Sequence, residues 1–379
     1  MTRLTGSPIT RIERAGLIIA LTISACLMWP LRAYLTDDTF IHLRYAEHLA
    51  RGEGLVFNSG ERVYGCTSPL WVALLADGLA LGLDGVWTAK ILGALATFAS
   101  IALFLQLMRR TLVTPGMRAL ATVAWGGHAW MARWGVSGME TPLAVALVLA
   151  GFVAFTEGTA WGSRPVRTGT LWALGALTRP EVGFLLGLWG IFLIADAENR
   201  AGIRRLIFGS LPPLVIYGGW LAFARVYFGS FLPQTLPAKT AGSGGPGFSF
   251  ELLQRQLEIV MSTEGLLLLV LALAIVFAGS RVIPGTLVTH RVLPWAWVFA
   301  VPVLYVSRGV PVISRYLLPL MPVIAWLAWR AAEAWWRGAD SEAPRRRVTV
   351  LAAVLAGGVL VQNFVVYQTR VVPHVGEFT

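Results

Sequence analysis

The chain has 379 residues, of which 56% are hydrophobic and 13% charged, and its formal net charge is +11. A soluble domain of this length needs far more charge on its surface, so the composition excludes an ordinary soluble enzyme. The arginines lie in short clusters between apolar runs, which is typical of membrane-protein loops and argues against nucleic acid as a partner. The sequence therefore predicts an all-α integral membrane protein.

Apolar runs that can form transmembrane helices, roughly 20 residues each, recur along the whole chain. The first run follows Arg11 and Arg14 and lacks a small-residue cleavage site, so we expect it to be retained as a span. The fifth and sixth runs are short, and we expect them to form a pair that only partly crosses. In chain order the eleven predicted spans are 15–35, 86–108, 117–134, 141–157, 169–178, 181–196, 205–228, 264–280, 292–307, 314–336 and 348–367.

The basic clusters predict the orientation of these spans. If the N-terminus is cytoplasmic, 18 of the 31 Lys and Arg residues fall in compact juxtamembrane clusters on that side, as the positive-inside rule requires. The apolar stretch 68–83 is then not a span, because a crossing there would place Arg109 and Arg110 outside. We expect it to be an interfacial or partly inserted external helix. The protein is expected in the inner (plasma) membrane, with its C-terminus outside.

Two predicted external segments are longer than a compact bundle needs, and such loops usually serve function. The first is 36–85, with an amphipathic run over 39–51, and the second is 229–263. Residues 1–379 are expected to form one transmembrane domain, without a C-terminal soluble domain.

Three acidic residues in the external turns are candidates for general-base chemistry. Asp37 and Asp38 open the first external segment, where Thr36 can cap a helix and carboxylates suit the positive end of the helix dipole. Two adjacent carboxylates at the membrane rim, with Arg44 one or two turns away, exceed what capping requires, and a partly desolvated carboxylate can act as a base. Glu140 lies in the turn between the third and fourth spans, where snorkelling to water is the simpler explanation.

Isolated basic residues on the predicted external side run against the positive-inside trend. They are Arg179 between the two short spans, Lys239 in the second external segment, and Arg308 and Arg315 beside Tyr316. Arg179 can pair locally with Glu181. Alternatively the cations converge into an anion site, and at a membrane face the obvious anion is a lipid phosphate.

The sequence contains no clear motif for metal binding, nucleotide binding or serine hydrolysis. The five histidines and two cysteines lack metal-ligand spacing. No Walker loop, nucleotide-binding glycine fingerprint or GxSxG motif occurs, which argues against an ATP-driven pump or a serine hydrolase. Asp37 and Asp38 beside a phosphate could hold Mg²⁺ or Mn²⁺, but they are adjacent rather than spaced as in a DxD signature. No cofactor is therefore assigned, and a divalent cation is kept as a hypothesis.

Five separated motifs resemble, in order, those of the GT-C glycosyltransferases. The likeness is greatest to the arabinofuranosyltransferase branch, which works on mycobacterial and corynebacterial cell-wall polysaccharide. The first motif combines DDTFIHLRYA at 37–46, GEGLVFNSGERV at 52–63 and TSPLW at 67–71; the others are SGMETPL at 137–143, TRPE at 178–181, the run 233–239 and RYLLP at 315–319. Cys66 replaces an aromatic residue of the family pattern, which bears on sugar and acceptor identity rather than on class.

The resemblance implies a GT-C type bundle of about eleven transmembrane helices with external amphipathic juxtamembrane helices. It implies an inverting enzyme that moves a sugar, arabinofuranose or a hexose, from a polyprenyl phosphate donor to a cell-envelope glycan, lipid or protein acceptor at the external face. The base is then Asp37 or Asp38, assisted by Glu140. The implied donor-phosphate or substrate-binding residues are Arg44, Arg62, Arg179, Glu181, Lys239, Arg308, Arg315 and Tyr316.

Two readings from other classes stay open. A transporter or flippase of lipid-linked intermediates would use the short spans 169–196, with Arg179 and Glu181 as its binding centre; the hydropathy shows no internal repeat that would support it. A non-catalytic scaffold that partners another enzyme is the third reading, and the intact Asp37, Asp38 and Glu140 argue against it.

Overall fold

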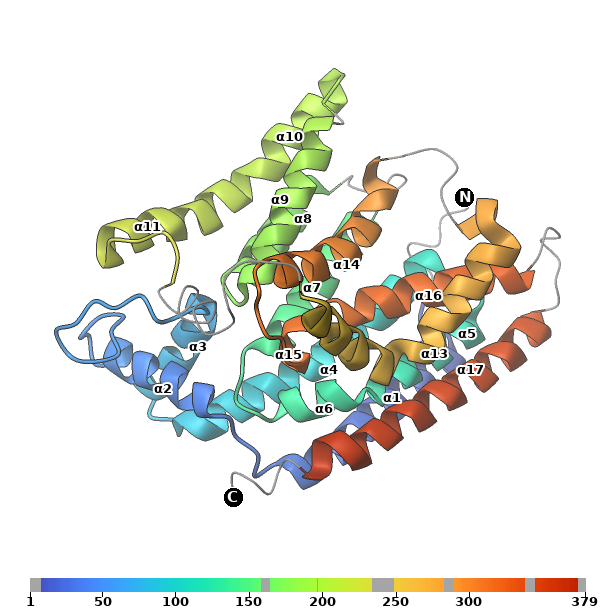
Figure 1. Cartoon of the computed structure of the whole chain (residues 1–379), viewed down its shortest axis with the longest axis horizontal. Helices are drawn as coiled ribbons and strands as arrows, with labels where there is room; N and C mark the ends of the chain where they lie inside the picture. The colour runs from blue at the N-terminus through green and yellow to red at the C-terminus, as the bar shows by residue number, and fades with distance from the viewer. Residues whose placement is uncertain are drawn as a thin grey trace.

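The computed structural model describes residues 8–157, 164–195, 197–233, 249–282, 289–337 and 345–373, and within these ranges the chain is helical, without a strand (Figure 1). In chain order the elements are α1 (Arg11–Met28), η1 (Trp29–Leu31), α2 (Asp37–Ala50), α3 (Pro69–Ala80), α4 (Gly85–Thr111), α5 (Pro115–Gly126), α6 (Ala129–Gly135), α7 (Thr141–Phe155), α8 (Pro165–Ala176), α9 (Pro180–Ala195), α10 (Arg200–Pro213), η2 (Leu214–Gly218), α11 (Gly219–Phe228), α13 (Phe250–Val282), α14 (Thr289–Ser307), α15 (Ser314–Leu317), α16 (Met321–Arg337), α17 (Arg345–Val366) and η3 (Tyr367–Val371).

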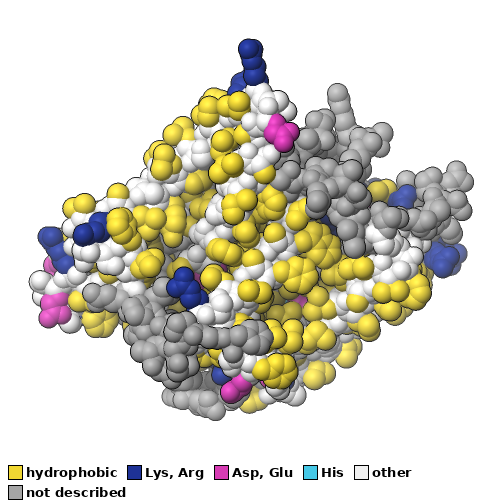
Figure 2. Space-filling view, turned by 45° about the horizontal axis from the view of Figure 1, so that its top comes forward, with side chains coloured by type: hydrophobic (Ala, Val, Ile, Leu, Met, Phe, Trp, Pro, Cys, Tyr) yellow, Lys and Arg dark blue, Asp and Glu magenta, His cyan; other side chains and the backbone are white. Residues whose placement is uncertain are grey.

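Five of these helical stretches are long and apolar enough to cross a membrane: Arg11–Leu31, Gly85–Thr111, Arg200–Phe228, Phe250–Gly279 and Arg346–Val371. Each overlaps a predicted span. Shorter apolar helices include α7, α9 and most of α14, and also α3, which lies in the stretch predicted as an external helix. In the face shown in Figure 2, hydrophobic side chains are spread over the described helices and charged side chains are few, as expected of a surface that faces lipid. The count of eleven spans stays a prediction.

Two predicted spans are interrupted. The range 117–134 is split into α5 and α6 because Gly126 and Gly127 favour helix poorly, and the His128 side chain starts α6 by accepting a hydrogen bond from the Met131 amide. The range 314–336 is split into α15 and α16 around Pro319, which has no amide hydrogen to continue the helix. The two short helices that result, α6 and α15, contribute residues to the cavity described below.

The predicted loop over 229–263 is too long at its C-terminal side. Helix α13 already begins at Phe250, so 250–263 is helical. The prediction ended the apolar span where polar residues begin, but Glu, Gln and Leu are good helix formers in water as well. Residues 234–248 of this segment lie outside the described residues.

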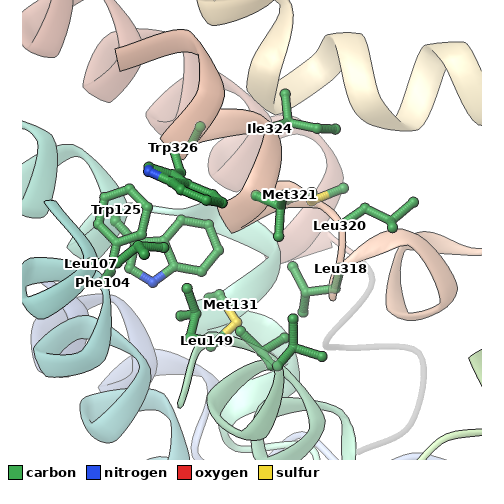
Figure 3. Close-up of a cluster of buried hydrophobic side chains, with 14 of the residues drawn as sticks. Phe104, Leu107, Trp125, Met131, Leu149, Leu318, Leu320, Met321, Ile324 and Trp326 are labelled. Atoms are coloured by element: carbon green, nitrogen blue, oxygen red, sulfur yellow. The ribbon is translucent and has the colours of Figure 1, made fainter. Parts of the chain in front are cut away.

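The centre of the bundle is a packed layer of aromatic and aliphatic side chains (Figure 3). Phe104 of α4 stacks on Trp125 of α5 with ring centroids 5.5 Å apart, and Phe152 of α7 lies 5.6 Å from Trp326 of α16. Within lipid such close packing, rather than exclusion of water, holds helices together. The layer fixes α4, α5, α7 and α16 relative to one another, and with them the turns at their ends.

Three of the segments predicted to be cytoplasmic contact one another: the N-terminus, the turn after α4 and the C-terminal part of α16. Buried Glu13, at the start of α1, accepts a hydrogen bond of 2.9 Å from Arg118 of α5 and lies 3.5 Å from Arg109 at the end of α4. Glu333 of α16 accepts the amides of Val113 and Thr114 between α4 and α5. The predicted alternation of turns between two sides is therefore consistent with how the helices pack.

Candidate functional site

A cavity of about 620 Å³ lies beside the N-terminus of α2, at the opposite ends of α1 and α4 from the Glu13 cluster. Charged groups of both signs and aromatic rings line it. The cationic residues are Arg133, Arg255, Arg315 and Arg370, the acidic residues are Asp37, Asp38 and Glu258, and the aromatic residues are Tyr34, Trp130 and Trp134. These residues come from α2, α6, α13, α15, η3 and the turn after η1, so the cavity is assembled from distant parts of the chain.

Asp37 and Asp38 occupy the first turn of α2, where the helix dipole stabilises negative charge. Thr36 is the cap residue by position, but its side chain makes no capping bond, so that part of the prediction is wrong. Its hydroxyl instead pairs with the hydroxyl of Thr39 at 3.0 Å. Asp37 is exposed toward the cavity, whereas Asp38 is bonded to Arg315.

Arg315 joins the acidic edge of the cavity to its aromatic wall. Its Nη2 donates to Asp38, and its guanidinium carbon lies 5.7 Å from the Trp134 ring centroid and 5.4 Å from that of Tyr316. The side chain is 10% exposed, and its buried Nε has no hydrogen-bond partner. A guanidinium held this way at the edge of a cavity is suited to bind an anion.

Glu140, Arg179 and Glu181 form a buried ionic network behind the cavity. Arg179 donates to Glu140 at 2.8 Å from Nη1, and to Glu181 at 2.7 Å from Nη2 and 3.2 Å from Nε. Tyr305 of α14 donates to Glu181. Arg179 also lies over the Tyr316 ring, 5.1 Å from its centroid. Arg179 therefore pairs with Glu181, which is one of the two alternatives predicted from the sequence, and it also pairs with Glu140.

His42 lies between the two groups of acids. It lies one helical turn after Asp38 on the same face of α2, and its Nδ1 is 3.8 Å from Oε2 of Glu140. Burial lowers the pKa of His42 below its usual range, outweighing the opposite effect of the Glu140 and Asp38 carboxylates. Burial therefore favours the neutral form of the His42 imidazole.

Several predicted cations lie away from this cavity. Exposed Arg44 donates to the Phe57 carbonyl and lies 3.6 Å from Glu47. Arg62 stacks over the Tyr227 ring of α11 at 4.6 Å, and exposed Arg308 follows the end of α14. Lys239 lies outside the described residues. Of the predicted basic residues, the structure brings Arg315 to the cavity and Arg179 to the network behind it.

Three arginines that line the cavity, Arg133, Arg255 and Arg370, are not among the predicted site residues. Arg133 lies shortly before the Glu140 motif in the sequence. Arg370 is an isolated basic residue beyond the last predicted span, on the predicted external side, and the same kind of isolation marks Arg179 as a candidate. Arg255 lay in the segment read as a loop, so its helical position on α13 was not foreseen. Arg133 donates to the Tyr34 hydroxyl at 3.1 Å from Nε and at 2.8 Å from Nη2.

A divalent cation fits these residues poorly. Among the described residues, no three His, Cys, Asp or Glu side chains are grouped to hold a metal ion. Asp38 already pairs with Arg315, and Asp37 is its neighbour in sequence. The Mg²⁺ or Mn²⁺ hypothesis therefore stays a prediction, and no chemical step is assigned to a metal.

Two curated proteins resemble the chain in sequence. A terminal beta-(1->2)-arabinofuranosyltransferase of Corynebacterium glutamicum is 27% identical over 274 residues, which is 62% of this chain and 37% of that protein. The protein of the same name from Mycobacterium tuberculosis is 31% identical over 253 residues, 60% of this chain and 39% of the relative. The chain thus spans about two fifths of the length of these relatives. No protein-family model matches it.

Solved structures share the fold. ArnT from Cupriavidus metallidurans bound to undecaprenyl phosphate superposes with a TM-score of 0.62 at 16% identity, covering 96% of this chain and 74% of that one. The Archaeoglobus fulgidus oligosaccharyltransferase, tethered with an acceptor peptide, gives a TM-score of 0.56 at 11% identity, covering 93% and 55%. The chain is thus a multi-pass membrane protein, and the predicted all-α architecture and family resemblance are confirmed.

Proposed function

We propose that this chain, which has the GT-C fold and resembles the arabinofuranosyltransferase branch in sequence, is an inverting glycosyltransferase that uses a polyprenyl phosphate sugar. The observation that carries the proposal is the cavity that combines two carboxylates at a helix N-terminus with four arginines. The sugar is arabinofuranose or a hexose. The acceptor is a hydroxyl of a cell-envelope glycan, lipid or protein.

The charges of the cavity suit such a donor. Its four arginines and three acids leave a formal excess of one positive charge. A polyprenyl phosphate sugar is a phosphodiester with one negative charge, so the excess balances the bound donor. The arginines on the phosphate then meet the charge that develops as the sugar leaves.

Asp37 is assigned as the base because it faces the cavity while Asp38 is engaged by Arg315. The acceptor hydroxyl oxygen attacks the anomeric carbon and forms the new glycosidic bond. Its proton passes to the Asp37 carboxylate, and the carbon–oxygen bond to the phosphate breaks with its electron pair on polyprenyl phosphate. The phosphate gains the negative charge that Asp37 loses, so the total charge in the cavity is unchanged.

Glu140 is assigned an indirect role. Its carboxylate is only 4% exposed and is held by Arg179 at 2.8 Å. On one side it lies near His42. On the other side its partner Arg179 lies over the Tyr316 ring, and Arg315 packs against the same ring. In the proposed mechanism Glu140 and Arg179 support the Arg315 wall of the cavity, while Glu181 holds Arg179 from its other side.

The proposed location is the inner (plasma) membrane, with the N-terminus cytoplasmic and the cavity on the external face. The basis is the arginine distribution, since Arg109 and Arg118, which belong to a cluster that the positive-inside rule assigns to the cytoplasm, lie against Glu13 at the other end of α1 and α4 from the cavity. The hydrophobic face seen in Figure 2 would contact the polyprenyl chain, and the donor phosphate would reach the cavity from the bilayer.

The contacts of Arg179 and Glu181, the binding centre that a transporter would use, favour the glycosyltransferase proposal over the transporter hypothesis. Arg179 and Glu181 bond to each other, to Glu140 and to Tyr305 in a buried network, and neither residue lines the cavity. The scaffold reading assigns no use to the charged cavity. Both readings predict that the purified chain does not cleave a donor.

The experiment that tests the proposal uses purified protein in nanodiscs. It is incubated with polyprenyl phosphate arabinofuranose, mannose or glucose, with and without oligosaccharide acceptors, and released polyprenyl phosphate is measured. Release that depends on acceptor is expected with one of these donors, and EDTA in a parallel reaction tests the divalent cation. Failure to release polyprenyl phosphate from any donor, with folded protein, would favour the transporter or scaffold readings.

Replacement of Arg315 with alanine is expected to weaken donor binding about 10- to 100-fold, because a charge-assisted contact to phosphate contributes roughly 1.5–3 kcal/mol. The measurement is the Kd for polyprenyl phosphate, determined by calorimetry or a thermal-shift titration. Arg308→Ala is the matched control, since that exposed arginine does not line the cavity. Equal Kd values for Arg315→Ala and the wild type would remove Arg315 from the phosphate site.

A further inference from the structure

Lys90 of α4 is buried, 7% exposed, and its ammonium is bound entirely by backbone oxygens. Its Nζ donates to the carbonyls of Arg32 at 2.7 Å, Tyr34 at 2.6 Å and Val136 at 3.0 Å. A lysine ammonium has three hydrogens, so each can be directed to one of these acceptors. Among the described residues no carboxylate pairs with it.

The choice of lysine at this position is itself informative. Of the 31 Lys and Arg residues of the chain, only Lys90 and Lys239 are lysines. Burying an ammonium without a counter-ion is costly, so packing alone would favour an apolar residue here. A compact ammonium directs its hydrogens to three converging carbonyls, whereas the planar guanidinium of arginine does not.

The three carbonyls belong to the two segments that carry the proposed site acids. Arg32 and Tyr34 lie in the turn that leads directly to Asp37 and Asp38. Val136 begins the turn that leads to Glu140. Tyr34 also lines the cavity and accepts hydrogen bonds from Arg133. Lys90 therefore connects the two acidic turns to each other and to the helix that lies between them.

The two backbone carbonyls that follow Val136 in the turn leading to Glu140 also accept hydrogen bonds from side chains. Ser137 accepts from the Thr39 hydroxyl of α2 at 2.8 Å, and Gly138 accepts from the indole of Trp71 in α3 at 3.2 Å. Gly138 has φ +83° and lies against Thr39, a left-handed conformation that favours glycine. Three successive carbonyls are thus fixed by side chains of α4, α2 and α3.

We infer that Lys90 is a positioning residue, which sets the place of Asp37 and of the Glu140 turn relative to the cavity by tying both segments to α4. The inference rests on the proposed glycosyl transfer. A misplacement of about 1 Å can lower the rate of an enzyme about 100-fold. Loss of the ammonium should therefore affect turnover far more than donor binding.

The test is Lys90→Met, which keeps the unbranched side chain except for its terminal atom and so removes the ammonium. We expect kcat to fall about 100-fold, with the Kd for polyprenyl phosphate within about threefold of the wild-type value because Arg315 is untouched. Hydrogen exchange should rise in peptides that cover 30–40 and 134–142. Thr88→Val is the matched control: it removes a buried hydroxyl on the same helix that bonds only the Asp84 carbonyl, and should change none of these values.

A Lys90→Met protein with kcat within twofold of the wild type, or with unchanged exchange in both peptides, would overturn the inference. If Lys90→Met does not fold, Lys90→Arg keeps the charge without the converging donors and should show the same separation of kcat from donor binding. If the wild type turns over no donor, the proposed function fails on its own. The exchange measurement then still decides whether Lys90 holds the two turns.

Discussion

Replacement of Asp37 with asparagine is expected to lower kcat for sugar transfer by about 10²- to 10⁴-fold, the usual contribution of a general base. The amide keeps the shape of the side chain and its place on the first turn of α2, but it does not accept the proton of the acceptor hydroxyl. Donor binding should stay within about threefold of the wild type, because Arg315 and Asp38 still pair. Turnover and polyprenyl phosphate Kd, measured on the same preparation, separate the two effects.

Asp77→Asn is the matched control for this substitution. Asp77 is an exposed acid on α3 that does not line the cavity, so its amide variant should turn over at the wild-type rate. Asp38→Asn should behave differently from both, because loss of the Asp38 charge frees Arg315 and changes donor binding as well. Wild-type turnover in Asp37→Asn would assign the base to another group.

Replacement of Arg179 with methionine is expected to destabilise the folded protein by about 3–5 kcal/mol, because it leaves buried carboxylates without their cation. Glu140 and Glu181 are 4% and 7% exposed, and both depend on Arg179 for charge compensation. The result should appear as a lower thermal unfolding midpoint in detergent and as lower yield of monodisperse protein.

Arg164→Met is the control for Arg179, since Arg164 is an exposed arginine before α8 and its loss should change stability by less than about 0.5 kcal/mol. Combining Arg179→Met with Glu140→Gln and Glu181→Gln should recover part of the lost stability, because neutral amides remove the uncompensated charge. If the single and triple variants were equally unstable, packing rather than charge would explain the role of Arg179.

The sequence predicted the membrane class, the acids at the start of α2 and the family resemblance, because these depend on local patterns. Apolar runs of membrane length mark helices wherever they occur. Asp37 and Asp38 stand out because a helix cap does not need two acids. The charge pattern predicts a helix over 68–83 that does not cross the membrane, since a crossing there would reverse the position of Arg109 and Arg110; the structure has helix α3 there, at Pro69–Ala80, and its external position stays a prediction.

The composition of the cavity was not predictable in the same way. Arg133, Arg255 and Arg370 converge only through tertiary packing of α6, α13 and η3. The bonds of Lys90 to backbone carbonyls carry no sequence signal, because any chain segment supplies a carbonyl. Arg44 and Arg62 fall in recognised motifs but bind neighbouring loop and helix groups instead.

The central claim is a single displacement in which Asp37 activates the acceptor and the arginines of the cavity receive the departing phosphate. The most direct measurement is the anomeric configuration of the transferred sugar in the product, determined by NMR and compared with that of the polyprenyl phosphate donor. Inversion is the result that this mechanism predicts. Retention of configuration would contradict it, because retention requires two successive displacements and a group that holds the sugar between them.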